Sequence, residues 1–187
     1  MRQSAYFHRR KTGYTIRMDF HPLIVHFPIA LLVVYSLLEL VRVRRLEEQE
    51  WWLMVKTVFL VIGTLGAGMA LMTGDVAAEL NGREGPLLQL HEWFAQASSF
   101  VFGILTIHYL IASARRLSVH ERFRKEAYPF FARVYAMNEE LFRPWLTVLL
   151  AVAGLIGMSI VGALGGALVY GPNADPVVSF IYGLFLK

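Results

Sequence analysis

Four apolar stretches restrict what this chain can fold into more than any other feature of its sequence. They cover residues 22–41, 51–72, 86–114 and 144–170. Each is long enough to cross a hydrocarbon core of about 30 Å as a helix, which takes about 20 residues. None alternates as a barrel strand does, and a backbone in lipid must satisfy its own polar groups. The stretches therefore predict an all-α, polytopic membrane protein built as a four-transmembrane-helix bundle.

The composition agrees with a membrane protein and narrows its chemistry. Hydrophobic residues make up 56% of the 187, and the mean hydropathy is +0.49, above the usual range for a soluble domain. There is no cysteine, which excludes disulfides, iron–sulfur clusters, thiolate zinc sites and covalent haem attachment. No phosphate loop, nucleophile–base pattern or nucleic-acid signature stands out, and the loops explain the net charge of +4. A redox centre would have to use histidine, methionine or oxygen ligands.

Positive charges predict how the chain is oriented. Eleven Lys and Arg lie in the loops after the first and third stretches or at the start of the second: Arg42, Arg44, Arg45, Lys56, Arg115, Arg116, Arg122, Arg124, Lys125, Arg133 and Arg143. Outside the tail, the opposite side has Arg83 and Lys187, so the positive-inside rule places both termini outside. The basic tail, residues 1–20, conflicts with this orientation. It has no apolar core before a small-residue cleavage site, so we expect no removable signal peptide.

With four antiparallel spans, chemically unusual residues from every span meet at one membrane face. These residues are His21 and His26 in the first span, Thr73, Gly74 and Asp75 in the second, His91 and Glu92 in the third, and Gly165, Gly166 and Tyr170 in the fourth. Ionisable groups inside a membrane segment are costly and mark functional sites by default. Because bundle cores hold cofactors between facing helices, this face is the predicted site.

His26 and His91 have the spacing expected of two axial haem ligands. Proline is favoured at the first helical position, so Pro22 and Pro86 predict where the first and third spans begin. His26 follows by four residues and His91 by five, which sets the two imidazoles at nearly equal depth on parallel helices. His21 is turned about 140° from His26 around the helix. It would cap the helix or hydrogen-bond a propionate or a neighbour rather than coordinate the same metal.

The same residues also have plain structural interpretations. His26 and His91 would hydrogen-bond to help the helices associate. Asp75 would either end the second helix in water or accept the N–H of a ligating histidine. Closely spaced glycines such as Gly162 and Gly166 would let helices approach, or would leave room for a flat macrocycle. The residues alone leave these alternatives open.

Two segments outside the spans have an amphipathic or apolar character. The long segment 115–143 mixes charge with aromatic residues, Phe123, Phe130, Phe131 and Tyr135, and predicts a long amphipathic loop on the membrane surface between the third and fourth spans. The C-terminal segment 172–187 is too short to span, so it would lie in the interface or pack on another subunit. His108 has no histidine at its depth in the other spans, so a second haem would lack a partner.

The motifs of the four spans resemble a widespread bacterial membrane family catalogued as domain of unknown function 2231. They are HPLIVHFPIALL from His21, TGD from Thr73, the HE pair at His91 and GGALVYG from Gly165. The likeness covers about residues 20–171. The family is grouped with cytochrome b-like proteins that hold haem between helices, so the resemblance implies electron transfer. Unlike two-haem relatives, this chain has one convincing histidine pair.

The sequence predicts a basic tail at 1–20, a membrane domain at 21–171 and a C-terminal interfacial segment at 172–187. The domain would bind one haem b per chain between the first and third spans. Its metal ligands would be His26 and His91, with His21, Asp75, Thr73, Gly165, Gly166 and Tyr170 around the cofactor. It would be an electron-transfer subunit rather than a stand-alone enzyme.

The expected location is a bacterial inner membrane, with both termini periplasmic. Partners would be the lipid bilayer and other membrane or periplasmic redox subunits or a quinone, and no nucleic acid. Two alternatives remain open. One is a cofactor-free structural subunit, and the other is a non-haem metal site made of His21, His26, Asp75 and His91, because imidazole and carboxylate suit iron, copper or zinc.

Overall fold

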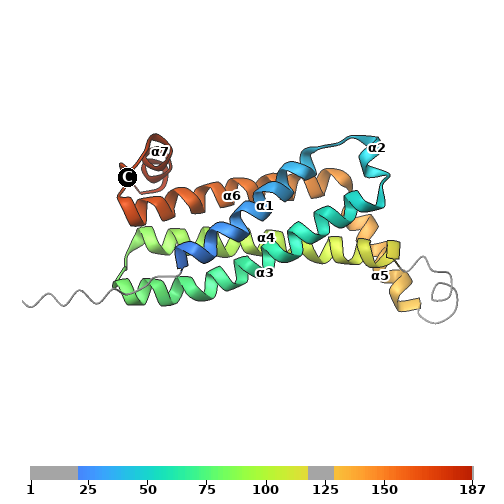
Figure 1. Ribbon diagram of the computed structural model, residues 1–187, viewed down its shortest axis with the longest axis horizontal. Coiled ribbons are helices and arrows are strands. Elements are labelled where there is room, and N and C mark those ends of the chain that lie inside the picture. The colour runs from blue at the N-terminus through green and yellow to red at the C-terminus, as the bar shows by residue number, and fades with distance from the viewer. Residues whose placement is uncertain (1–20, 118–128, 187) are drawn as a thin grey trace, which may run out of the picture.

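The computed structural model describes residues 21–117 and 129–186, which form seven helices. Four are long and apolar enough to cross a membrane: α1 (His21–Leu40), α3 (Glu50–Asn81), α4 (Pro86–Leu117) and α6 (Pro144–Tyr170). The shorter helices are α2 (Arg44–Glu47), α5 (Pro129–Leu141) and α7 (Pro176–Phe185). In Figure 1 the long helices run side by side, with α2 and α5 at one end and α7 at the other. The predicted all-α, four-span architecture is confirmed.

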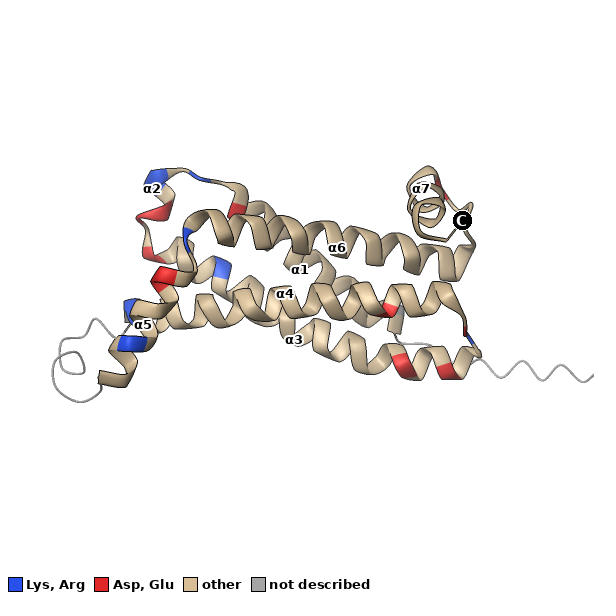
Figure 2. Ribbon diagram, turned by 180° about the vertical axis from the view of Figure 1, so that it is seen from behind, with Lys and Arg blue, Asp and Glu red and all other residues tan. Residues whose placement is uncertain are grey.

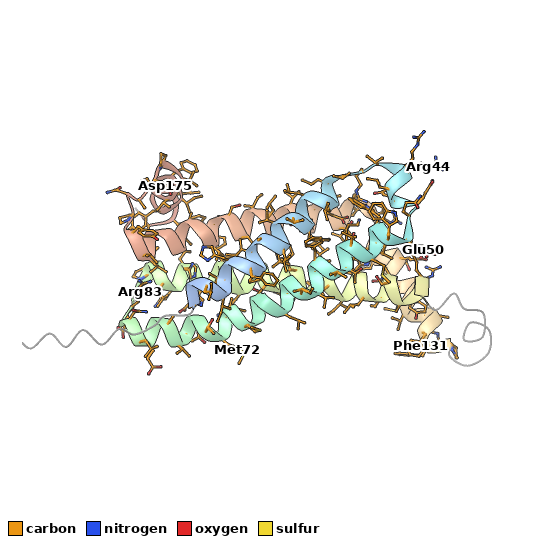
Figure 3. All side chains as sticks on the ribbon, viewed as in Figure 1. Arg44, Glu50, Met72, Arg83, Phe131 and Asp175 are labelled. Carbon is orange, nitrogen blue, oxygen red and sulfur yellow. The ribbon has the colours of Figure 1, made fainter. Side chains whose placement is uncertain are left out.

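The four long helices are arranged so that α1 and α4 lie on a diagonal. α1 packs against α3 and α6, and α4 packs against the same two helices from the other side. Leu32, Tyr35, Leu60, Phe102 and Leu105 fill the centre and are fully buried. Large apolar side chains also cover the outside, where a bilayer would surround them. Figure 3 shows one of these, Met72, on the outer surface of α3.

Glycines bring the long helices together in two pairs. A Cβ added at Gly63 of α3 would lie 2.7 Å from the Leu32 side chain of α1, and one at Gly154 of α6 would lie 2.6 Å from the Phe102 ring of α4. Such close approach is how helices associate in lipid, where burial of apolar surface supplies no drive. Gly162, an example used in the sequence analysis, has no atom within 4 Å of its added Cβ. Helix packing therefore rests on other glycines of the same spans.

The second span is longer than its apolar stretch predicted. α3 continues from residue 72 to Asn81 and ends at Gly82, whose φ of 59° is the left-handed conformation that glycine adopts readily after a helix. Residues 73–75 lie inside the helix. Of the two alternatives left open for Asp75, the one in which it ends the helix is wrong, because the following residues, VAAEL, are mostly good helix formers and continue α3.

The segment between α4 and α6 is partly helical and is attached to the bundle. α5 carries three of the four predicted aromatic residues, whereas Phe123 lies outside the described residues. His108 of α4 hydrogen-bonds through Nδ1 to Asn138 Oδ1 of α5 at 3.0 Å, and Arg115 forms an ion pair with Glu139. Phe130 and Phe131 remain exposed on α5, which is the arrangement of an amphipathic helix at a membrane surface.

The C-terminal segment packs on its own bundle. Asp175 caps α7 by accepting hydrogen bonds from the backbone N–H groups of Val177 and Val178 at 2.8 and 2.9 Å. Val178 is buried against Ala163 and Ala167 of α6. The opposite face of α7 exposes apolar side chains, among them Phe180 and Leu184. Within the chain, this segment therefore covers the end of α6.

Lys and Arg residues gather at the end that holds α2 and α5, whereas Asp and Glu residues lie at both ends (Figure 2). Among the described Lys and Arg residues, Arg83 alone lies at the other end, as Figure 3 shows. The positive-inside rule uses this uneven distribution of Lys and Arg to assign the cytoplasmic end. The side of the membrane on which each end lies stays a prediction.

Candidate functional site

The starts of α1 and α4 and the later parts of α3 and α6 lie at the end of the bundle opposite α2 and α5 (Figure 1). We call this region the histidine end. It consists of His21 of α1, Thr73 and Gly74 of α3, His91 of α4, and Val161 and Gly165 of α6. The structure thus brings together residues from all four long helices at this end.

His21 is held by α3. Its Nδ1 lies 3.0 Å from Thr73 Oγ1, and that hydroxyl lies 3.1 Å from the carbonyls of Met69 and Ala70. The hydroxyl has one hydrogen, and when it donates this to a carbonyl of its own helix it accepts a hydrogen bond from Nδ1 of His21. Gly74 lies against the ring, since an added Cβ would lie 3.3 Å from its Cε1. The Thr73 hydroxyl therefore orients this imidazole.

His91 is held in the same way by α6. Its Nδ1 donates to the Val161 carbonyl at 3.2 Å, because a carbonyl oxygen can only accept. The hydrogen then sits on Nδ1 and leaves Nε2 with its lone pair. Gly165 lies beside the half-buried ring, with an added Cβ 3.4 Å from Cε1. His21 is close enough to act on His91 electrostatically.

His26 does not occupy the position predicted for it. Its side chain is exposed, whereas His21 is half-buried. The buried stripe of α1 runs through Pro28, Leu32 and later residues, and His21 lies seven residues before Pro28, on the same face of the helix. Since His21 and His26 are turned about 140° apart, one of them must face outward. The structure gives the inward position to His21.

The other predicted site residues divide between the histidine end and the surface. Thr73 and Gly165 contact the two imidazoles, as described. Gly166 instead faces α7, with an added Cβ 3.3 Å from Val178. Asp75 is exposed, and Tyr170 is 80% exposed.

A non-haem metal site is not assembled from these residues. Within residues 21–117 and 129–186, no group of three or more His, Cys, Asp or Glu side chains has an arrangement that could hold a metal ion. His21, His26, Asp75 and His91 therefore do not form one metal-binding group in the described part of the chain. The sequence alternative of a four-residue metal centre loses its support, because two of the four face outward.

A second polar site, which the sequence analysis missed, lies at the opposite end of the bundle. The Glu39 carboxylate of α1 is 1% exposed. Its Oε1 accepts from Arg42 and from Thr147 of α6, both at 2.8 Å, and its Oε2 accepts from Lys56 of α3 at 2.9 Å and from the hydroxyl of Tyr109 of α4. These five residues are called the Glu39 cluster below. One carboxylate thus joins all four spanning helices.

The charges of the Glu39 cluster support one another. Partial burial disfavours the Arg42 cation, but its hydrogen bond to Glu47 and the charges of Glu39 and Glu47 outweigh that cost and raise the pKa of the guanidinium. Arg42 also donates to the Pro144 carbonyl at 2.8 Å. The Lys56 ammonium lies 5.1 Å from the centre of the Tyr109 ring, a cation–π distance. The buried carboxylate therefore has its countercharges within contact.

A signal for this cluster was present in the sequence. Glu39 and Lys56 are ionisable residues inside apolar stretches, each a few residues from the loop that joins the first two spans. Antiparallel neighbours place them at similar depth, so a pair was the natural inference. When Lys56 is taken only as a positive charge near the loop, as the positive-inside rule takes it, this pair is missed.

Comparison with known proteins gives one match. A family model described as predicted membrane protein (DUF2231) matches residues 17–174. This span covers both the histidine end and the Glu39 cluster, and it confirms the family that the sequence motifs indicated. No curated protein and no solved structure matches the chain.

Proposed function

The chain belongs to the DUF2231 family of predicted membrane proteins, and we propose that its histidine end binds one haem b between α1 and α4. As a multi-pass membrane protein it would act as an electron-transfer subunit. Its partners would be another redox protein or a quinone. A haem, when bound, supplies a one-electron carrier.

One observation carries this proposal. Two imidazoles come from diagonal helices at the same end of the bundle, and each has its Nδ1 held by an oxygen of the neighbouring helix. Histidines that ligate a metal commonly donate their other ring N–H to a backbone carbonyl or another acceptor, which fixes the tautomer and the ring orientation. The chemistry of the His21 and His91 imidazoles therefore fits a pair of histidine ligands to one haem iron.

The roles of the residues follow from these contacts. His91 and His21 would hold the haem iron through their imidazoles, with His21 in place of His26. Thr73 and Val161 would orient the two rings. Gly165 would keep the space beside the His91 ring clear, since any side chain there would meet the imidazole.

The proposed haem site lies at one end of the bundle, so electrons that cross the membrane would need a second redox centre. A single redox centre near one leaflet cannot carry electrons across a core of about 30 Å alone. The protein would therefore need a partner redox centre, in keeping with a subunit of an inner-membrane complex. The positive-inside rule would place the histidine end on the periplasmic side.

The test is a reduced-minus-oxidised absorption spectrum of the detergent-purified protein, with a pyridine haemochrome assay to count haem. We expect about one haem b per chain, lost in His91→Ala and His21→Ala. His26→Ala is the matched control from the outward face of the same helix, and it should keep the Soret band. Loss of the Soret band in His26→Ala, with its retention in His21→Ala, would instead support His26 and His91 as the ligand pair, as predicted from the sequence.

A cofactor-free structural subunit is the second candidate, and the same contacts favour it. The two histidines already tie α1 to α3 and α4 to α6 through hydrogen bonds, as polar residues do between membrane helices. A flat spectrum from protein expressed with ample haem would contradict haem binding and support this candidate.

A further inference from the structure

A groove lies at the charged end of the bundle, in the angle between α5, α4 and the start of α6. It has a volume of about 650 Å³. Ile107 of α4, Met137 and Leu141 of α5, and Trp145 of α6 form apolar walls, and all four side chains are more than half exposed. Figure 1 shows α5 projecting from the bundle beside the end of α4. Neither the histidine end nor the Glu39 cluster includes any of these residues.

The groove extends from the edge of the membrane into its apolar core. Arg143, which lines it, is the N-cap of α6, so it lies where the spanning helix begins. Ile107 lies nine residues before Arg116 at the end of the α4 span, which is about 14 Å of helix. The walls therefore face lipid acyl chains while the mouth is at headgroup level, where Trp and Arg side chains are common.

The mouth of the groove carries one charge of each sign. Glu140 of α5 and Arg143 both line it. Neither forms an ion pair with another residue of the described ranges. A guanidinium binds a phosphate through several parallel hydrogen bonds, and a carboxylate accepts from a primary ammonium. An anionic headgroup would meet Glu140 as well as Arg143, so the pair of charges suits a zwitterion better than an anion.

We propose that this groove is a binding site for a phospholipid whose headgroup joins a phosphate to a primary ammonium, as in phosphatidylethanolamine. Arg143 binds the phosphate and Glu140 binds the ammonium. One acyl chain lies against Ile107, Met137, Leu141 and Trp145. The bound lipid fills the space between α5 and the bundle and so holds α5 at the membrane surface.

Trp145 fluorescence tests the site. The protein is placed in phosphatidylcholine vesicles that contain one brominated lipid, either phosphatidylethanolamine, phosphatidylglycerol or phosphatidylcholine, at equal mole fraction. The fluorescence of Trp145 is obtained by subtracting the fluorescence of the Trp145→Phe variant from that of the unmodified protein. We expect brominated phosphatidylethanolamine to quench Trp145 about two- to fivefold more than the other two lipids. The preference is modest because the ion pair between Glu140 and the lipid ammonium would be exposed to water. Trp93, near the opposite end of α4, provides the control through Trp93→Phe, and its quenching should not depend on the headgroup.

Two substitutions separate the charges. Arg143→Gln should remove the excess quenching by phosphatidylethanolamine, whereas Arg133→Gln, on α5 but outside the groove lining, should keep it. Glu140→Gln should abolish the preference for phosphatidylethanolamine over phosphatidylglycerol. Equal quenching by all three lipids would overturn the proposal, and so would a preference for phosphatidylglycerol in the unmodified protein. Absence of Trp145 quenching by any lipid would also overturn it, since another occupant would then cover the groove.

Discussion

The two ends of the bundle use polar side chains in different ways. At the histidine end, each imidazole bonds to one neighbouring helix, α1 to α3 and α4 to α6. In the Glu39 cluster, one carboxylate accepts four hydrogen bonds, and its donors come from all the other spanning helices and from Arg42. The ends therefore differ in how many helices a single group connects.

The two ends also differ in the hydrogen-bonding capacity that remains for a ligand. The Glu39 cluster has its polar groups engaged in joining helices, whereas the histidine end keeps a ring nitrogen available. A carboxylate has about four lone-pair positions, and those of Glu39 are all engaged, so it has no capacity left for a ligand. His91 uses one ring nitrogen for the helix contact and keeps the other as an acceptor. An ionisable group in a membrane is a functional candidate by default. We nevertheless assign Glu39 a role in stability, because its carboxylate is fully hydrogen-bonded to other parts of the bundle.

Neutralising Glu39 should have the largest effect on stability. In Glu39→Gln the buried Lys56 keeps its charge and loses its anion, which should cost about 3–5 kcal/mol. The measurement is unfolding by SDS titration in mixed micelles. The matched control is Glu39→Gln combined with Lys56→Met, which removes both charges and should be less destabilised than the sum of the single changes. A stable Glu39→Gln protein would mean that water already screens the cluster.

Filling a helix contact between the two ends should have an intermediate effect. Gly154→Ala places a Cβ against the Phe102 ring and should destabilise the bundle by about 1–3 kcal/mol in the same titration, because a packed core resists added volume. Gly162→Ala is the control on the same helix, where the added Cβ meets nothing within 4 Å. It should be neutral or slightly stabilising. Equal losses in both variants would point to a general glycine requirement rather than to this contact.

Removing a hydrogen bond at the histidine end should have the smallest effect. Thr73→Val deletes the acceptor of His21, and a hydrogen bond between membrane helices contributes about 0.6 kcal/mol on average. The SDS titration should therefore place this variant close to the unmodified protein. A loss as large as that of Glu39→Gln would contradict the division between the two ends, because the histidine end would then hold the fold as well.

Much of the candidate site followed from topology. Antiparallel spans of similar length must bring the start of α1 beside the later part of α3, and the start of α4 beside the end of α6. The convergence of His21, Thr73, His91 and Gly165 could thus be predicted. The identity of the inward histidine of α1 was predicted differently. The rotation of about 140° separates His21 from His26 but does not say which of them faces inward, and the matched depth of His26 and His91 favoured the wrong one.

The sequence by itself determined the fold class, the number of spans and the family. The length of the apolar stretches, their lack of strand-like alternation and the need to satisfy every backbone polar group in lipid together require helices. Only the tertiary structure decided which face of each helix points inward. In a membrane both the lipid-facing and the core-facing sides are apolar, so hydrophobicity does not orient the helix. Packing at Gly63 and Gly154 and the bonds of Glu39 set that rotation, and with it the inward position of His21.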